Sequence, residues 1–236
     1  MPKTTALVVA AGAGKRMGRG EIPKQFLQIA SLPILAHTLA RFEGFRCVSQ
    51  VVLVVRREDV ERGRSEVVEK YHFDKVKAVV PGGPTRQDSV YNGLQAVDPQ
   101  TDIVVIHDGV RIFVTEAVVL ESIHAAQSYG GAVVAVPVKD TIKRVSEDGF
   151  VCETLNRHEL WAIQTPQTFT YPLIQLAHEK ARQDGFYGTD DAVLLERLGY
   201  AVKIVPGSYR NIKITTPEDL ILADLILQEE LKEPRL

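Results

Sequence analysis

Short apolar runs rich in β-branched residues recur along the chain, separated by segments long enough to form helices. These runs cover residues 6–11, 51–55, 76–80, 103–106 and 132–136. They show little polar alternation, which is typical of strands covered on both faces, as in a parallel sheet between helices. Because strands and helices alternate, the sequence predicts a doubly wound, three-layer α/β/α fold with a mostly parallel sheet.

Apolar residues at helical spacing mark the intervening segments. The expected helices are 31–43, 86–97, 115–129, 171–184 and 189–198, and further strands are expected at 201–205 and 211–215. The last helix should begin at Pro217 with Thr216 as its N-cap, because proline suits the first helical position. No repeat or linker divides the sequence, so we expect a single domain over 1–236.

The segment 139–157 breaks the alternating pattern. It is polar, lacks a helical stripe and contains Asp148-Gly149 between two β-prone halves. These features predict a hairpin arm that turns at Asp-Gly and projects from the sheet. A lone two-stranded hairpin is marginally stable in water, and this one carries Phe150 and Val151. It is therefore expected to pair with a second subunit, or alternatively to fold back on its own sheet.

Global composition limits the classes of partner. The formal net charge is −2, so nothing predicts binding to nucleic acid, and any phosphate-binding charge must be local. Cys47 and Cys152 have no metal-ligand or redox spacing, which favours thiols in a reducing compartment. No apolar stretch approaches the about 18 residues of a membrane span. We therefore expect a cytoplasmic protein.

A glycine-containing loop follows the first strand directly. It comprises Ala10, Ala11, Gly12, Ala13 and Gly14. Glycines let backbone N–H groups approach a phosphate. The dinucleotide fingerprint would need glycine at Met17, and the P-loop would need glycine at Val9, so neither motif fits. With Arg16 and Lys24 close behind, the loop predicts a triphosphate site of another type; the alternative is a tight turn with solvated cations.

His107-Asp108-Gly109 lies where the strand at 103–106 ends. Ligands bind at the carboxyl ends of parallel strands, so a carboxylate here favours a functional role. His107 beside it is expected to be structural rather than a general base. Gly82-Gly83 could simply be a turn, and Ser89 a helix-start residue.

The ordered series of motifs resembles a known family, the 2-C-methyl-D-erythritol 4-phosphate cytidylyltransferases. The resemblance begins with AAGAGKRM (10–17) and PKQFLQIASLPILAHTL (23–39). It continues, in the family's order, with GGPTRQDSV (82–90), IHDGVR (106–111), VPVKDTIKR (136–144), LNRHELWAIQTPQ (155–167), GTDDAVLLE (188–196) and NIKIT (211–215). It implies transfer of a cytidylyl group from CTP to 2-C-methyl-D-erythritol 4-phosphate, with release of pyrophosphate.

The resemblance also implies roles for individual residues. The catalytic cations would be Arg16, Lys24, Arg157 and Lys213. The nucleotide would be bound by Ala10, Ala11, Gly12, Ala13, Gly14, Gly82, Gly83, Ser89 and Gly109. The acceptor would be contacted by Arg111, Thr141 and Thr165, and Asp108 would hold Mg²⁺. The resemblance further implies a homodimer in which the arm 139–157 reaches the partner's substrate site.

The sequence departs from the family pattern in two places, and three other functions compete with the one that the resemblance implies. The family commonly has HDAARP where residues 107–112 read HDGVRI, and an acidic residue where Pro84 stands. Gly109 is expected to remove one methyl group from the nucleotide side of the pocket.

The competing functions are cytidylyl transfer to another polyol phosphate such as ribitol 5-phosphate, a sugar-1-phosphate nucleotidyltransferase, and a nucleotide-binding regulator without turnover. Intact Arg16, Lys24, Asp108 and Lys213 argue against the regulator.

Overall fold

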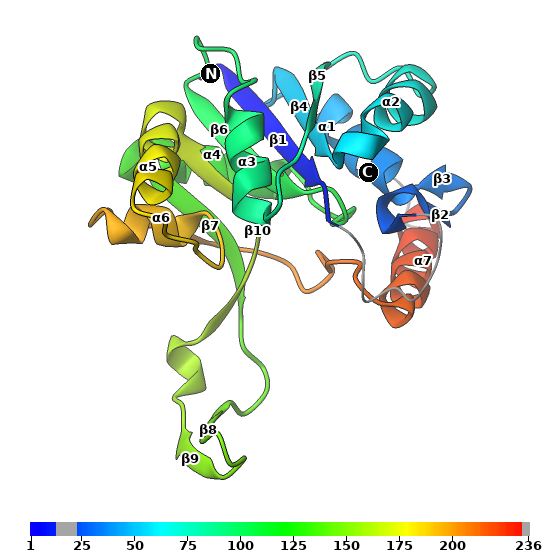
Figure 1. Ribbon diagram of the computed structural model, residues 1–236. Coiled ribbons are helices and arrows are strands. Elements are labelled where there is room, and N and C mark those ends of the chain that lie inside the picture. The colour runs from blue at the N-terminus through cyan, green and yellow to red at the C-terminus, as the bar shows by residue number, and fades with distance from the viewer. Residues whose placement is uncertain (13–22, 233–236) are drawn as a thin grey trace.

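A seven-stranded sheet forms the centre of the computed structural model, which describes residues 1–12 and 23–232 (Figure 1). The strand order is β11-β7-β10-β6-β1-β4-β5. The strands are β1 (Thr4–Ala10), β4 (Gln50–Val55), β5 (Val76–Pro81), β6 (Ile103–Asp108), β7 (Gly131–Pro137), β10 (Trp161–Thr170) and β11 (Lys203–Pro206). Neighbouring strands pair in parallel except at β10, which runs antiparallel between β6 and β7. The predicted mostly parallel sheet is confirmed.

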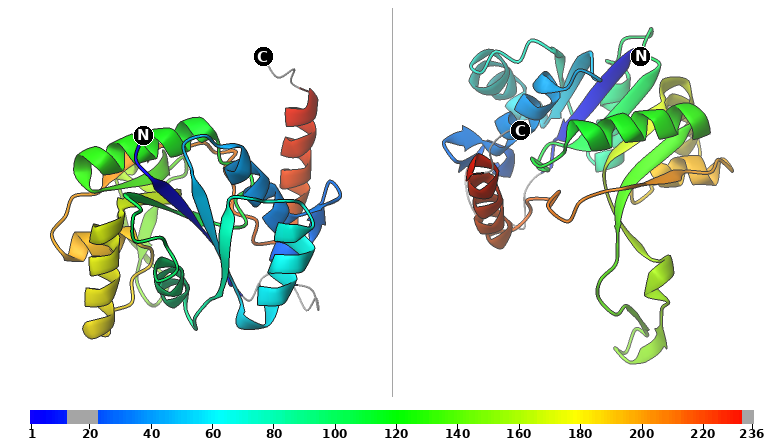
Figure 2. Two further views of the ribbon diagram at one scale, coloured as in Figure 1. Left: turned by 90° about the horizontal axis from the view of Figure 1, so that it is seen from above. Right: turned by 180° about the vertical axis from the view of Figure 1, so that it is seen from behind.

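Helices cover both faces of this sheet (Figures 1 and 2). One face carries α1 (Ile34–Gly44), α4 (Glu116–Tyr129) and the short α2 (Val60–Arg62), which continues as the π-helical segment η4 (Gly63–Glu69). The other face carries α3 (Arg86–Leu94), α5 (Tyr171–Gln183) and α6 (Ala192–Arg197). In β1, Ala6 and Val8 pack toward α1, whereas Leu7 packs toward α3. Strands with apolar side chains on both faces thus produce the expected three layers.

The segment between β7 and β10 projects from the body as an arm (Figure 1). Its strands β8 (Lys143–Val145) and β9 (Val151–Thr154) pair antiparallel, and Gly149 has a φ of 83° in the turn. Glycine adopts this left-handed conformation without steric cost, so the predicted Asp-Gly hairpin is confirmed. Val145, Phe150 and Val151 are exposed by 57%, 74% and 62%. This chain therefore leaves the apolar side chains of the arm uncovered.

The last helix, α7 (Pro217–Lys232), begins as predicted at Pro217, and Thr216 Oγ1 accepts a hydrogen bond from Asp219 N. It packs beside a small hairpin of β2 (Gln28–Ile29) and β3 (Leu32–Pro33). Short 3₁₀ turns complete the described elements: η2 (Lys24–Phe26), η3 (Arg57–Asp59) and η5 (Arg157–Glu159). None of the helices within the described ranges is long and apolar enough to cross a membrane.

Two strand assignments need correction. The strand predicted over 211–215 is wrong: the segment is irregular, and Ile214 N donates a single backbone bond to Val110 O. Its apolar residues anchor it in a small core with α7 rather than in the sheet. Conversely, the sequence did not predict β10, whose interior contains Gln164, Pro166 and a register shift between Ile163 and Gln167. Its polar side chains and its proline do not match the apolar pattern expected of a central strand, so β10 had no recognisable signal in the sequence.

Candidate active site

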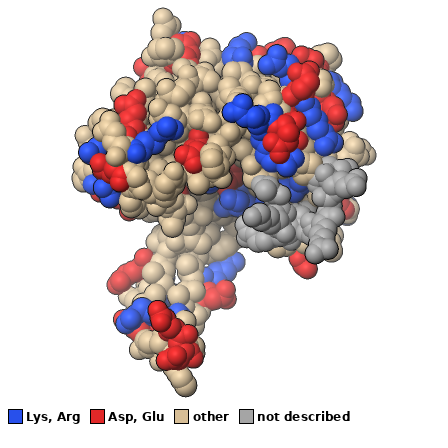
Figure 3. Space-filling model, in the orientation of Figure 1, with Lys and Arg blue, Asp and Glu red and all other residues tan. Residues whose placement is uncertain are grey.

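A cavity of about 420 Å³ lies at the carboxyl ends of β1, β5 and β6. Predicted residues that line it are Ala10, Ala11, Gly12, Lys24, Gly83, Ser89, Asp108 and Lys213. Ligands are expected at this end of parallel strands. Acidic and basic side chains are otherwise interspersed over the face of the molecule in Figure 3. The cavity itself is lined by three basic side chains, Lys24, Arg86 and Lys213, and one acidic side chain, Asp108.

Two lysines from distant segments meet at this cavity. Lys24 Nζ donates to the backbone oxygen of Ile214 at 3.2 Å, and Lys213 Nζ lies 2.8 Å from Asp108 Oδ2. The segment that carries Lys213 is fixed because Ile214 is fully buried and bonds to the backbone of Val110. The irregular segment 211–215 therefore delivers one cation directly and helps to hold the other.

Asp108 is the carboxylate at the centre of the site. Arg86 Nε lies 3.5 Å from its Oδ1, and Arg111 Nε lies 3.6 Å from its Oδ2. Burial alone would raise the pKa of Asp108, but Arg86, Lys213 and Arg111 outweigh burial and hold this pKa well below its usual value. The side chain is therefore an anion at any physiological pH and can bind a cation.

His107 is structural, as predicted. Its Nδ1 is 3.0 Å from Thr165 Oγ1, which in turn accepts a hydrogen bond from Asp108 N, and its Nε2 contacts the backbone oxygen of Arg111. Burial lowers the pKa of His107 to about 4, so the ring is neutral at pH 7. A fully buried, doubly hydrogen-bonded ring has no access to a substrate proton.

Thr165 and Arg111, which were predicted to contact the acceptor, each have hydrogen-bond partners within the protein. The Thr165 hydroxyl is shared between His107 and Asp108 N, and Arg111 Nη1 donates to Asn211 O at 2.7 Å. Both side chains are buried, and neither is among the residues that line the cavity. They fix the wall that carries Asp108.

The Gly82-Gly83 turn is shaped by Ser89. Its Oγ accepts a hydrogen bond from Gly83 N at 3.1 Å and lies 2.9 Å from Thr85 O, to which it donates. A Cβ on Gly82 would lie 2.5 Å from the Cβ of Ala11. Gly83 and Ser89 line the cavity, whereas Gly82 lies behind them and sets the shape of the turn.

For the CTP that the family resemblance implies, we expect Gly82→Ala to raise the KM by about tenfold, because the added methyl group pushes Ala11 and Ser89 into the cavity at a cost of about 1–3 kcal/mol. The KM for the acceptor should change less. Gly44→Ala is the matched control, since its Cβ would meet nothing within 4 Å. Steady-state kinetics would contradict this role if the two variants had equal KM values for CTP.

Gly109 requires a correction of its predicted direction. A methyl group there would lie 2.9 Å from Ala10 Cβ and 3.3 Å from Leu35 Cδ1. It would thus face the core beneath the loop and not the nucleotide side of the pocket. Gly109 is also absent from the residues that line the cavity, so glycine at this position serves close packing of strand ends.

Several predicted residues lie elsewhere. Thr141 and Arg157 are exposed at the base of the arm, where Arg157 Nη1 donates to Lys139 O at 3.1 Å, and neither lines the cavity of this chain. Ala13, Gly14 and Arg16 lie outside the described residues. The predicted catalytic set is therefore only partly brought together within one chain.

Sequence reasoning missed Arg86, which lines the cavity, and its partner Asp191. The two side chains form an ion pair of 2.7 Å across 105 residues. The helix predicted over 189–198 begins only at Ala192, and Asp191, directly before it, is buried. An acidic residue directly before an apolar helix was the available signal. Gln25 was also missed: its buried Nε2 has no partner among the described residues, and the residue lines the cavity.

Comparisons with known proteins agree with this arrangement. The family model of 2-C-methyl-D-erythritol 4-phosphate cytidylyltransferase matches residues 4–229. The chain is 52% identical over 228 residues to the protein of that name from Geotalea uraniireducens, covering 96% of this chain and 97% of the relative. It is 49% identical over 229 residues to the one from Syntrophus aciditrophicus, covering 97% of each.

Solved structures give the same result. The 4-diphosphocytidyl-2C-methyl-D-erythritol synthase of Anaerococcus prevotii superposes with a TM-score of 0.85 at 36% identity, covering 96% of both chains. The 2-C-methyl-D-erythritol 4-phosphate cytidylyltransferase of Thermus thermophilus has a TM-score of 0.78 at 31% identity, covering 97% of this chain and all of that one.

Proposed function

The chain belongs to the 2-C-methyl-D-erythritol 4-phosphate cytidylyltransferase family, and we propose that the cavity beside Asp108 holds CTP against the acceptor phosphate. The protein is an enzyme that transfers the cytidylyl group of CTP to 2-C-methyl-D-erythritol 4-phosphate, in isoprenoid biosynthesis. The observation that carries the site assignment is the meeting of Lys24, Lys213 and Asp108 at one cavity.

The chemistry needs positioned charge rather than a strong base. An oxygen of the acceptor phosphate attacks the α-phosphorus of CTP in line, and the bond to the pyrophosphate leaving group breaks. A phosphomonoester is already largely dianionic at pH 7, its second pKa being about 6, so no side chain has to remove a proton. The barrier comes from bringing anions together. Lys24 and Lys213 neutralise charge at the reacting phosphates, and the Ser89-supported turn holds the base.

Mg²⁺ fits this site as a partner of the nucleotide. The described residues contain no group of three His, Cys, Asp or Glu side chains able to hold a metal on their own. Mg²⁺ is usually bound by one or two carboxylates together with substrate phosphates, and Asp108 supplies one such carboxylate beside the cavity. When bound there, the ion would neutralise charge on the phosphates. Asp108 would hold it, with Lys213 on the opposite carboxylate oxygen.

A homodimer is the second part of the proposal. The arm leaves Val145, Phe150 and Val151 uncovered, and a lone hairpin needs a partner surface. Arg157 and Thr141 lie at the base of the arm, away from the cavity of their own chain. Exchange of arms would bring both residues to a partner's acceptor site.

The unpaired thiols of Cys47 and Cys152 support a cytoplasmic location.

An assay of pyrophosphate release tests this function directly. We expect release from CTP with 2-C-methyl-D-erythritol 4-phosphate, dependent on Mg²⁺, and lower kcat/KM with UTP, ATP or GTP. Ribitol 5-phosphate is the control acceptor, because it offers the same attacking phosphate on another polyol. A higher kcat/KM with ribitol 5-phosphate would contradict the acceptor, and release without any acceptor would contradict the transfer reaction.

A further inference from the structure

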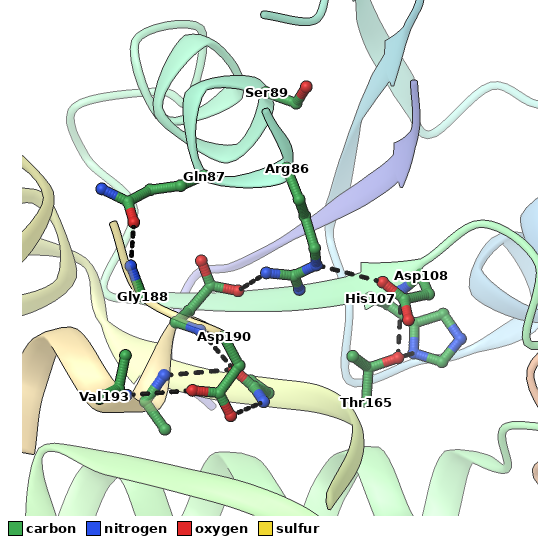
Figure 4. Close-up of polar contacts among 12 residues, drawn as sticks. Arg86, Gln87, Ser89, His107, Asp108, Thr165, Gly188, Asp190 and Val193 are labelled. Carbon is green, nitrogen blue, oxygen red and sulfur yellow. Dashed lines mark hydrogen bonds and ion pairs between the residues drawn. The ribbon is translucent and has the colours of Figure 1, made fainter. Parts of the chain in front are cut away.

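A line of polar contacts leads from Asp108 into the protein interior. Arg86 reaches from the start of α3 toward Asp108, with Nε 3.5 Å from Asp108 Oδ1 (Figure 4). Its Nη1 lies 2.7 Å from Asp191 Oδ2. Behind it, His178 Nε2 donates to Asp191 Oδ1 at 3.2 Å. The reaction itself uses neither Asp191 nor His178, so these contacts call for a separate explanation.

Asp191 is a fixed anion. Its side chain is 1% exposed, and its backbone nitrogen donates to Gln167 Oε1 at 3.0 Å. Burial would raise the pKa of Asp191, but Arg86 and His178 outweigh burial and keep the pKa below its usual value. His178 is fully buried and packs in α5. The carboxylate therefore stays charged and has little freedom to move.

Arg86 is the most exposed member of this set. Its side chain is 30% exposed and lines the cavity. The contact with Asp191 is a short charge-assisted hydrogen bond, whereas 3.5 Å to Asp108 is at the limit of hydrogen bonding. Lys213 is bound to the other oxygen of Asp108 at 2.8 Å. Asp108 Oδ1 is thus the less engaged oxygen, and the position of Arg86 decides how accessible it is.

We propose that Asp191 is a positioning residue that holds the Arg86 guanidinium back from Asp108, so that Oδ1 stays available to the Mg²⁺ of bound CTP. This inference rests on the proposed function, in which Asp108 binds that ion. Without the charge of Asp191, Asp108 is the remaining carboxylate in contact with Arg86, and Coulomb attraction draws the guanidinium onto Oδ1. Arg86 then competes with the metal ion.

The test compares CTP binding with and without Mg²⁺ by titration calorimetry, with no acceptor present and therefore no turnover. The quantity of interest is the gain in CTP affinity that Mg²⁺ provides. In Asp191→Asn this gain should fall by about tenfold or more, as substitutions of residues that orient metal ligands commonly do. Asp190→Asn is the matched control: Asp190 bonds to Gln167 and Val193 and contacts neither Arg86 nor Asp108.

A second variant separates positioning from loss of structure. In Arg86→Met with Asp191→Asn, the competing cation is gone, so the Mg²⁺-dependent gain should recover most of its wild-type value. Thermal unfolding establishes that each variant is folded. Asp108→Asn tests the metal site itself and should lose the Mg²⁺-dependent gain. If it does, a wild-type gain in Asp191→Asn, or no recovery in the double variant, would overturn the inference. If Asp108→Asn itself keeps the gain, the proposed metal site fails, and this inference with it.

Discussion

Replacing Lys24 by alanine is expected to lower kcat by about a hundredfold or more, because one preorganised charge stabiliser is typically worth this much. Lys24 lines the cavity, and its ammonium group is fixed by the backbone oxygen of Ile214. The negative charge at the reacting phosphates grows in the transition state, so loss of the cation should act on kcat more than on binding of CTP. The same loss is expected for Arg16→Ala.

Two further variants make this result interpretable. Lys24→Arg keeps the charge and should retain more activity than Lys24→Ala. Lys77→Ala removes an exposed lysine whose Nζ bonds to Asp74 O at 2.9 Å, and it should turn over like the unmodified enzyme. Single-turnover kinetics and thermal unfolding would be measured together. Near-wild-type turnover by folded Lys24→Ala would remove this lysine from the catalytic residues.

The second large effect concerns the arm. Replacing residues 142–155 with a short Gly-Ser turn should convert the proposed dimer into a monomer that binds CTP but turns over poorly. Binding should persist because the cavity residues lie outside the arm, and turnover should fall because Arg157 and Thr141 are no longer held at a partner's site. Analytical ultracentrifugation and the pyrophosphate assay give the two readouts.

A point substitution in the arm tests the same proposal without deleting residues, in case the shortened protein fails to fold. Phe150 is 74% exposed in this chain, so Phe150→Asp should be tolerated by the isolated fold yet oppose burial in a dimer interface. Tyr129→Asp is the matched control, since Tyr129 is 56% exposed at the end of α4, away from the arm. Full activity of a monomer in either arm variant would end the dimerisation proposal.

The local pattern of the chain was sufficient for most of the fold and for part of the site. Five apolar strands, the hairpin at Asp148-Gly149 and the start of α7 at Pro217 were predictable from neighbouring residues. Each depends on short-range physics: burial on both faces of a strand, the left-handed turn of glycine and the fixed φ of proline. The placement of Asp108 followed from the general rule for strand ends.

Only the tertiary structure decided which polar side chains meet. Arg86 pairs with Asp191, and the hydroxyl of Thr165 bonds to the His107 ring and to the backbone nitrogen of Asp108. The antiparallel position of β10 between β6 and β7 could not be predicted either. Its polar side chains find hydrogen-bond partners in the strands and loops around it, and these partners are distant in sequence. Hydrophobic periodicity reports the environment of one segment at a time. Pairing of distant charges depends on the path of the whole chain, which no local pattern encodes.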